Sequence, residues 1–417
     1  MNDPTWLDGV LRSARPTALA ALLRYFRDLD LAEEAFQEAC LRALRTWPQN
    51  GPPREPASWL IFVGRNAALD DVRRRAKQTV LPDEPQISDL DDAEDRLADR
   101  LDGEQYRDDI LRLLFICCHP ELPATQQIAL ALRIVCGLSV KEIALAFLVS
   151  EAAMEQRITR AKARVGAGEV PFETPSAAER TERLEAVATM IYLLFNEGYS
   201  ARREDAERRA ELADEAIRLG RLLLHLFPAD PEVMGLLALM LLQRARMAAR
   251  FDEAGNVVLL EDQDRSLWHA GQIAEGLALI DKAVRHRRPG PYQVQAAIAA
   301  LHARASTAQD TDWAEIDLLY ANLERLRPSP VVTLNRAVAV NKLRGAEAAL
   351  AMIEPLEPKL SAYFYFHGVR GALLQQLGRT SEARESFGRA IALANSPAEA
   401  AHIRQHLDRL QAAPQNS

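Results

Sequence analysis

Residues 124–165, ATQQIALALRIVCGLSVKEIALAFLVSEAAMEQRITRAKARV, contain the most informative local pattern in this sequence. Thr125 begins a predicted helix that Gly137 closes. Ser139 followed three residues later by Glu142 is a capping box, which satisfies two free donors at the start of a second helix. After the turn at residues 148–150, a third helix begins at Glu151. The spacing predicts two short helices joined by a tight turn.

The last of these helices has two distinct faces. Apolar residues recur at i, i+4, i+7 and i+11, which predicts a buried stripe of Met154, Ile158, Ala161 and Val165. Cations lie on another face, at Arg157, Arg160 and Arg164 with Lys162 adjacent. This pattern predicts a helix-turn-helix whose second helix fits the major groove, where arginine serves both phosphate contact and guanine recognition. Taken alone, a solvated basic face near a helix C-terminus is the alternative.

A second basic helix end lies in residues 56–77, PASWLIFVGRNAALDDVRRRAK. Its first half is apolar around most of the helix, and its second half carries Arg73, Arg74, Arg75 and Lys77. An arginine cluster beside Trp59 and Asn66 can hold single-stranded DNA by phosphate contact and stacking. The alternative is a surface helix end that pairs with its own carboxylates, since Asp70 and Asp71 precede arginines by four residues.

Composition limits the class of protein. The 417 residues carry 51 Lys and Arg against 59 Asp and Glu, so the net charge of -8 excludes a polybasic protein. A hydrophobic fraction of 48% excludes global disorder, and an aromatic fraction of only 6% favours helices over strands. Four cysteines do not make a disulfide framework. Without a signal peptide or membrane-spanning pattern, we expect a cytoplasmic protein with no membrane partner.

The chain divides at changes of composition. Residues 81–110 hold 3 basic against 12 acidic residues, which predicts an acidic linker. Beyond residue 176 helical patterns follow one another, and Gly345 and Gly378 lie 33 residues apart, close to the period of tetratricopeptide-like helix pairs. The predicted fold is all-α, with two small helical domains at 1–80 and 109–170, a linker at 81–108, and helical repeats at 171–417.

Two polar stretches interrupt the apolar repeats, FNEGYSA at 195–201 and EDQDRSLWH at 261–269. They predict either a ligand or partner pocket or, favoured two to one, a turn-stabilising hydrogen-bond network. The residues concerned are Asn196, Glu197, Tyr199, Asp262, Asp264, Arg265 and Trp268.

Three further motifs are interpreted as structural. DDAED at 91–95 matches a magnesium-binding motif but lies in the linker, Cys117 and Cys118 are typical of buried thiols, and His402 and His406 lie on a terminal helix. No metal or cofactor is predicted.

In combination, these segments resemble the extracytoplasmic-function group of sigma-70-family initiation factors. Residues 30–46, DLAEEAFQEACLRALRT, are similar to its polymerase-binding helix, residues 59–75 to its promoter −10 helix, and residues 122–165 to its −35-binding domain. LFNEGYSA and LLEDQDRSLW further resemble a subgroup with a C-terminal tetratricopeptide-like extension. The recognition helix departs from the family at Ala152, Ala153, Met154 and Glu155, so its base contact stays unassigned.

The resemblance implies a promoter-recognition factor that is not an enzyme, with core RNA polymerase and promoter DNA as partners. It assigns polymerase binding to Glu34, Gln37 and Glu38, and −10 contacts to Arg65, Asn66, Asp70, Arg73 and Arg74. It assigns −35 contacts to Arg157, Arg160, Lys162 and Arg164. The extension would modulate activity through polymerase, the DNA-binding domains or a regulatory protein. Two alternatives are a helical-repeat scaffold without promoter activity and an all-helical magnesium enzyme.

Overall fold

The computed structural model describes residues 5–76, 103–119, 121–147, 149–166, 177–199, 206–252, 256–394 and 397–412. These residues form helices, confirming the predicted all-α class, and the extended pairing among them is one isolated bridge between Phe251 and Val257. The chain forms two compact units, Met1–Leu194 and Phe195–Ser417. Helix α9 (Ala177–Tyr199) spans the boundary. None of the described helices combines the length and apolarity that a membrane crossing needs.

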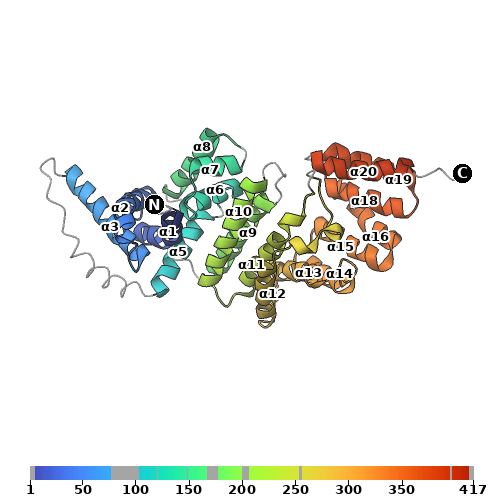
Figure 1. Cartoon of the computed structure of the whole chain (residues 1–417), viewed down its shortest axis with the longest axis horizontal. Helices are drawn as coiled ribbons and strands as arrows, with labels where there is room; N and C mark the ends of the chain where they lie inside the picture. The colour runs from blue at the N-terminus through green and yellow to red at the C-terminus, as the bar shows by residue number, and fades with distance from the viewer. Residues whose placement is uncertain are drawn as a thin grey trace. The chain divides into compact units, whose positions relative to one another are not determined.

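The first unit begins with three helices, α1 (Thr5–Phe26), α2 (Leu29–Asn50) and α3 (Pro56–Ala76), which pack on one another (Figure 1). Asp28 caps α2 by accepting a hydrogen bond from the Leu31 backbone amide at 3.0 Å. At the α2–α3 crossing, a Cβ on Gly64 would lie 2.8 Å from the Ala35 carbonyl oxygen, so glycine permits the close approach. Trp47 and Trp59 meet edge to face at 5.3 Å.

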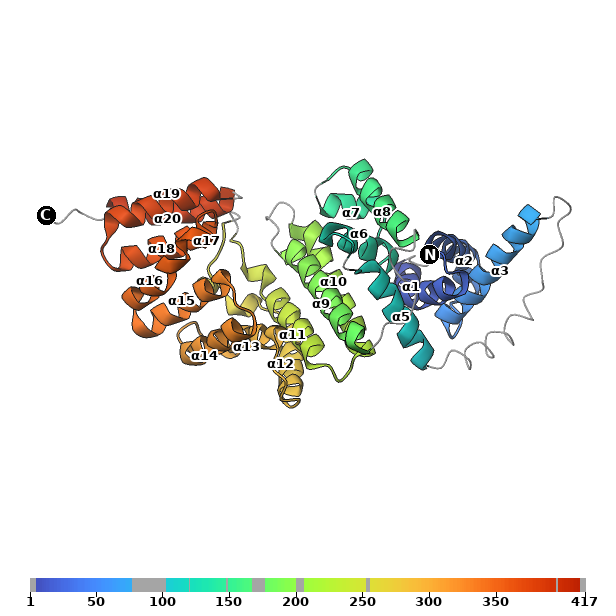
Figure 2. The ribbon, with the colours of Figure 1, turned by 180° about the vertical axis from the view of Figure 1, so that it is seen from behind.

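Among the described residues of the same unit, α5 (Gly103–Cys117), α6 (Ala124–Ile134), α7 (Val140–Ala146) and α8 (Glu151–Gly166) follow. Helix α5 packs against α1 and α6, while α8 packs against α6 and α7 (Figure 2). Because α5 begins at Gly103, the last residues of the segment assigned to the linker are helical. Residues 77–102, including DDAED, lie outside the described residues.

The second unit is built around α11 (Pro231–Ala245), which contacts α10 (Ala206–Leu226), α12 (Ala270–Val284) and α13 (Pro291–Arg304). Its residues 233–242 are all buried, because a helix with neighbours on several sides must be apolar on several sides. Between α11 and α12 run three 3₁₀ turns, Met247–Ala249, Leu260–Asp262 and Arg265–Leu267.

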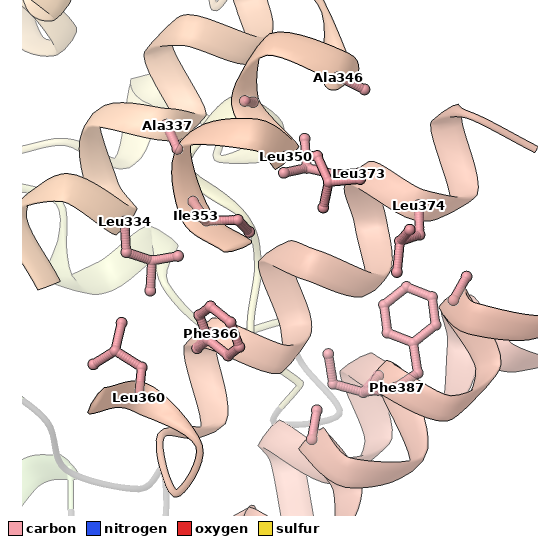
Figure 3. Close-up of a cluster of buried hydrophobic side chains, with 14 of the residues drawn as sticks. Leu334, Ala337, Ala346, Leu350, Ile353, Leu360, Phe366, Leu373, Leu374 and Phe387 are labelled. Atoms are coloured by element: carbon pink, nitrogen blue, oxygen red, sulfur yellow. The ribbon is translucent and has the colours of Figure 1, made fainter. Parts of the chain in front are cut away.

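The remaining helices are α14 (Trp313–Leu326), α15 (Pro330–Arg344), α16 (Ala346–Ile353), a 3₁₀ turn at Glu354–Leu356, α17 (Glu357–Leu360), α18 (Phe364–Gln376), α19 (Thr380–Leu393) and α20 (Pro397–Ala412). Gly345, with φ +85°, joins α15 to α16, and Gly378, with φ +70°, precedes α19. The pairs α15–α16 and α18–α19 each pack together around one apolar cluster, with Phe366 and Phe387 fully buried (Figure 3). The tetratricopeptide assignment of these pairs stays a prediction.

Candidate nucleic-acid interface

The helix-turn-helix is formed by α7 and α8 with the predicted capping box in place. The Ser139 amide donates to the Glu142 carboxylate at 2.6 Å, and the Glu142 amide donates to the Ser139 hydroxyl at 3.1 Å, which confirms the capping box. Ser150 likewise caps α8 through the Ala153 amide at 3.2 Å. Burial raises the pKa of Glu142, but the Ser139 hydrogen bonds together with Arg12 and Arg133 outweigh burial and hold it below its ordinary value.

The buried stripe of α8 is also confirmed. Its four members are at most 5% exposed: Met154, Ile158, Ala161 and Val165. Burying this stripe leaves Arg160 exposed and Arg157 half-buried, and neither forms an ion pair within the described part of the chain. Arg164, also exposed, donates to the Glu121 carbonyl at 3.2 Å. Two unpaired guanidinium groups on one face provide the charge that a DNA backbone requires.

Lys162 behaves differently from the other three cations of α8. Its ammonium contacts the Asp30 carboxylate at 2.7 Å and the Glu33 carboxylate at 2.5 Å, both on α2. Burial lowers the pKa of Lys162, but these two carboxylates outweigh burial and raise it above its ordinary value. In this arrangement Lys162 is therefore directed toward the first three helices.

Helix α3 places Arg65 and Asn66 half-buried on its surface. The Arg65 guanidinium lies 5.7 Å from the centre of the Tyr25 ring, and Tyr25 is 51% exposed. The side chains of Asp70, Arg73 and Arg74 lie outside the described residues, so their predicted −10 role stays a prediction. Sequence reasoning missed Tyr25. An aromatic ring at a helix end, beside a cation of another helix, is a surface on which a base can stack.

Helix α2 exposes an apolar stripe. Leu31, Leu41 and Leu44 are 39%, 51% and 50% exposed, and the predicted polymerase-binding residues lie between Leu31 and Leu41. Glu34 and Gln37 are exposed, and Glu38 pairs with Arg42 at 3.2 Å. Exposed leucines flanked by polar groups on one helix are typical of a protein interaction surface.

In the extension, two residues of the candidate pocket, Asp264 and Arg265, make hydrogen bonds and a ring contact within the protein. Asp264 caps a 3₁₀ turn through the Ser266 amide at 2.9 Å, and Arg265 donates to the carbonyls of His302 and Ala305 at 2.6 and 2.8 Å. The Arg265 guanidinium also lies 4.6 Å from the centre of the buried Trp268 ring. These bonds support the turn-stabilising interpretation.

The other candidates of the pocket lie on α9 and in the loop before Asp264. Tyr199 stacks on Phe195 and lies under the Arg250 guanidinium, 3.9 Å from its ring centre. Asn196 is half-buried, while Glu197 and Asp262 are exposed.

The three cysteines at 117, 118 and 136 are buried. Burial raises the pKa of Cys117 and Cys118, which keeps both as unreactive thiols. Across the described residues no group of three His, Cys, Asp or Glu side chains could hold a metal ion. The His406 ring stacks on Phe387 at 5.4 Å, whereas the His402 side chain is outside the described set.

Comparison with known families matches three parts of the chain. A model for sigma-70 region 2 matches residues 10–78, and a model for sigma-70 region 4 matches residues 112–165. A family of unknown function, DUF6596, matches residues 183–284. An uncharacterized protein of Rhizobium meliloti (strain 1021) is 70% identical over 414 residues, which cover 99% of this chain and 98% of that protein. No solved structure matches the chain.

The region 2 match overlaps α1–α3, and the region 4 match runs from within α5 through α8. The helix-turn-helix therefore lies within the region 4 match. Sigma-70-family members are transcription initiation factors rather than enzymes. This chain belongs to the sigma-70 family of RNA polymerase sigma factors, as an extracytoplasmic-function-like member with a C-terminal extension.

Proposed function

We propose that this protein is an alternative sigma factor that directs core RNA polymerase to promoters with defined −10 and −35 elements. The observation that carries this proposal is the cation face of α8 beside the buried stripe, where exposed Arg160 and half-buried Arg157 form no ion pair with the described residues. Such a face fits the major groove of duplex DNA. Arg164 and Lys162 complete the −35 set.

The −10 element contacts α3. Arg65 and Asn66 lie toward its middle, and Asp70, Arg73 and Arg74 follow along the same helix. Strand opening requires a base to leave the duplex stack, which costs a few kcal/mol. Tyr25 beside Arg65 offers a stacking platform that offsets part of this cost.

Core polymerase binds the exposed stripe of α2. Glu34, Gln37 and Glu38 supply polar contacts, and the exposed leucines supply the apolar area that the free protein leaves in water. The C-terminal helical unit modulates initiation through polymerase, through the promoter-binding modules or through a regulatory protein. The protein acts in the cytoplasm, where polymerase and promoter are found.

Run-off transcription with core polymerase tests this function. The template is the DNA upstream of this protein's own gene, and the parent protein is expected to give a specific transcript. Arg73→Ala with Arg74→Ala, and separately Arg157→Ala with Arg160→Ala, are expected to abolish it. Arg327→Ala, at an exposed arginine of the second unit, is the control and should leave the transcript unchanged.

A truncated chain ending at Tyr199, where α9 ends, tests the role of the extension. More transcript from the truncated chain shows inhibition by the extension, and less transcript shows that the extension is required. If the parent protein binds no core polymerase, the promoter-factor role is wrong and a helical-repeat scaffold takes its place.

A further inference from the structure

A run of basic residues follows α12 in the second unit. Four consecutive positions form the connection toward α13, and we call them the RHRR turn: Arg285, His286, Arg287 and Arg288. The three arginines of this turn are exposed, and the histidine is half-buried. Lys282, exposed on the last turn of α12, adds a further cation beside them.

The arginines of the RHRR turn have no carboxylate partner among the residues that the structure describes. Their guanidinium groups form neither an ion pair nor a hydrogen bond there. The neighbouring carboxylates already have partners, because Asp281 pairs with Arg304 at 3.1 Å and Glu232 accepts the amides that begin α13. The RHRR turn therefore presents positive charge that the protein itself leaves uncompensated.

Surface arginines elsewhere in the same unit do find partners. Arg221 pairs with Glu275 at 2.7 Å, and Arg336 pairs with Asp317 at 2.7 Å. The unit thus contains enough carboxylates to neutralise exposed arginines. The lack of partners at the RHRR turn is a local property of this surface and does not follow from the composition of the unit.

The backbone of the RHRR turn ends α12 without help from the arginine side chains. The His286 amide donates to the Ala283 carbonyl at 3.1 Å. The Arg287 amide donates to the Val284 carbonyl, also at 3.1 Å. Cations often lie at a helix C-terminus because free carbonyls attract them. Here backbone amides already satisfy these two carbonyls, so capping does not account for the arginine side chains.

Arg287 adopts a backbone conformation that glycine usually provides. Its φ of +52° lies in the left-handed region, which costs free energy for a residue with a Cβ atom. The next residue is fixed from α13, because the Arg288 carbonyl accepts a hydrogen bond from the Gln293 side-chain amide at 2.8 Å. Glycine at position 287 would form the same turn with less strain. The Arg287 side chain therefore does not serve the turn, which points to an external partner.

The chemistry of the RHRR turn fits the phosphate backbone of duplex DNA. A guanidinium group donates two parallel hydrogen bonds to a phosphate, and three such groups lie within four residues. The turn contains no Phe, Tyr or Trp on which the bases of a single strand would stack. Promoter binding by the first unit would also raise the effective concentration of duplex DNA around the second unit of the same chain.

We propose that the RHRR turn is an additional DNA-contacting surface, through which the C-terminal extension binds the duplex backbone next to the promoter elements. Phosphate contacts position a protein on DNA and carry no sequence information, so this surface adds affinity without altering promoter choice. The inference rests on the proposed promoter function for the source of the DNA. It gives the extension a defined part in promoter binding.

Fluorescence anisotropy of the full-length protein, with a labelled duplex from the DNA upstream of its own gene, tests this contact without polymerase. The triple variant Arg285→Ala, Arg287→Gly and Arg288→Ala removes three cations. Each lost phosphate contact reduces the steepness of log K against log salt by about 0.9, so the triple variant should reduce it by about 2.7. Between about 50 and 200 mM salt, the parent protein should then lose about 40-fold more affinity than the triple variant.

A matched control removes three arginines that do pair. Arg304→Ala, Arg344→Ala and Arg379→Ala change the net charge by the same amount, at exposed positions with carboxylate partners. This control should keep the salt dependence of the parent protein. Arg287→Gly alone should weaken duplex binding and keep the thermal midpoint close to or above that of the parent, because glycine relieves the left-handed conformation. A side chain that only supported the turn would instead lower the midpoint when removed.

An unchanged salt dependence in the triple variant would overturn the contact, and so would an equal change in the paired control. If the triple variant keeps its duplex affinity and loses affinity for core polymerase, the turn binds an acidic protein surface and the DNA assignment is wrong. The promoter function is judged separately by run-off transcription. If the parent protein yields no transcript but the triple variant still reduces the salt dependence, the sigma role fails and the DNA contact stands.

Discussion

Replacing Glu232 is expected to loosen the start of a helix that lies about sixty residues further along the chain. Glu232, on α11, accepts hydrogen bonds from the backbone amides of Tyr292 and Gln293 at 3.0 and 3.1 Å, and from the Gln293 side-chain amide at 3.0 Å. These amides begin α13, whose own N-cap residue, Gly290, has no side chain to supply an acceptor. A carboxylate from another helix therefore caps α13.

The magnitude follows from the bonds that are lost. A hydrogen bond to a charged group contributes about 1.5–3 kcal/mol, so three bonds set an upper limit near 5–9 kcal/mol. Glu232 is half-buried, and water can replace part of this loss. We expect Glu232→Ala to cost about 3 kcal/mol locally, and Glu232→Gln, which keeps one acceptor without charge, to cost about half as much.

Hydrogen exchange of the full-length protein, read at the amides of residues 292–296, measures the effect. A local loss of about 3 kcal/mol predicts exchange about 100-fold faster in Glu232→Ala. Glu275→Ala is the control, because Glu275 pairs with Arg221 on the surface, where such a pair contributes less than about 1 kcal/mol. Acceleration below about fivefold in Glu232→Ala, or equal acceleration in the control, would refute this account of the cap.

Three further predictions concern stability. Ser139→Ala removes one half of the capping box and should lower the free energy of unfolding of the first unit, measured in urea, by about 1 kcal/mol. Ser139→Thr is the control. Burial, reinforced by Arg246 and Arg265, lowers the pKa of His302 to about 4. As the pH is lowered from about 6.5 to 4, the unfolded chain binds a proton that the folded chain does not, so the free energy of unfolding should fall by up to about 3 kcal/mol. His302→Gln should remove this part of the pH dependence. Gly371→Ala puts a Cβ 2.6 Å from Phe387 and should destabilise the second unit by about 1–3 kcal/mol, whereas Gly368→Ala on the same helix, whose nearest contact is 3.5 Å away, should be neutral or stabilising by up to about 1 kcal/mol in thermal unfolding.

The local features of the helix-turn-helix could be predicted from sequence because their causes lie within a few residues. The capping box joins Ser139 to Glu142, three positions apart, and the stripe from Met154 to Val165 follows the helical period. The same holds for Gly345 and Gly378, whose positive φ angles fit the predicted breaks between helices. Each depends on short-range geometry that every helix shares.

The candidate site was only partly predictable, because burial and pairing depend on distant residues. Lys162 lies two positions after Arg160, so the helical period places the two side chains on different faces of α8. The sequence does not say which partner either face meets. The fold directs Lys162 to Glu33, 129 positions away, and leaves Arg160 in solvent. The contact between Tyr25 and Arg65 could not be predicted either, because the two residues lie on different helices that only the fold brings together.

The sequence by itself therefore determined the helical class, the capped helix-turn-helix and the family, since these rest on periodicity, capping and motif order along the chain. Only the tertiary structure decided which cation of α8 pairs with the carboxylates of α2 and which stays exposed. It also decided that Asp264 and Arg265 hydrogen-bond to backbone groups and that Glu232 caps α13. The physical reason is that the free energy of a charge depends on its solvent and its nearest opposite charge, and folding sets both by bringing distant segments together.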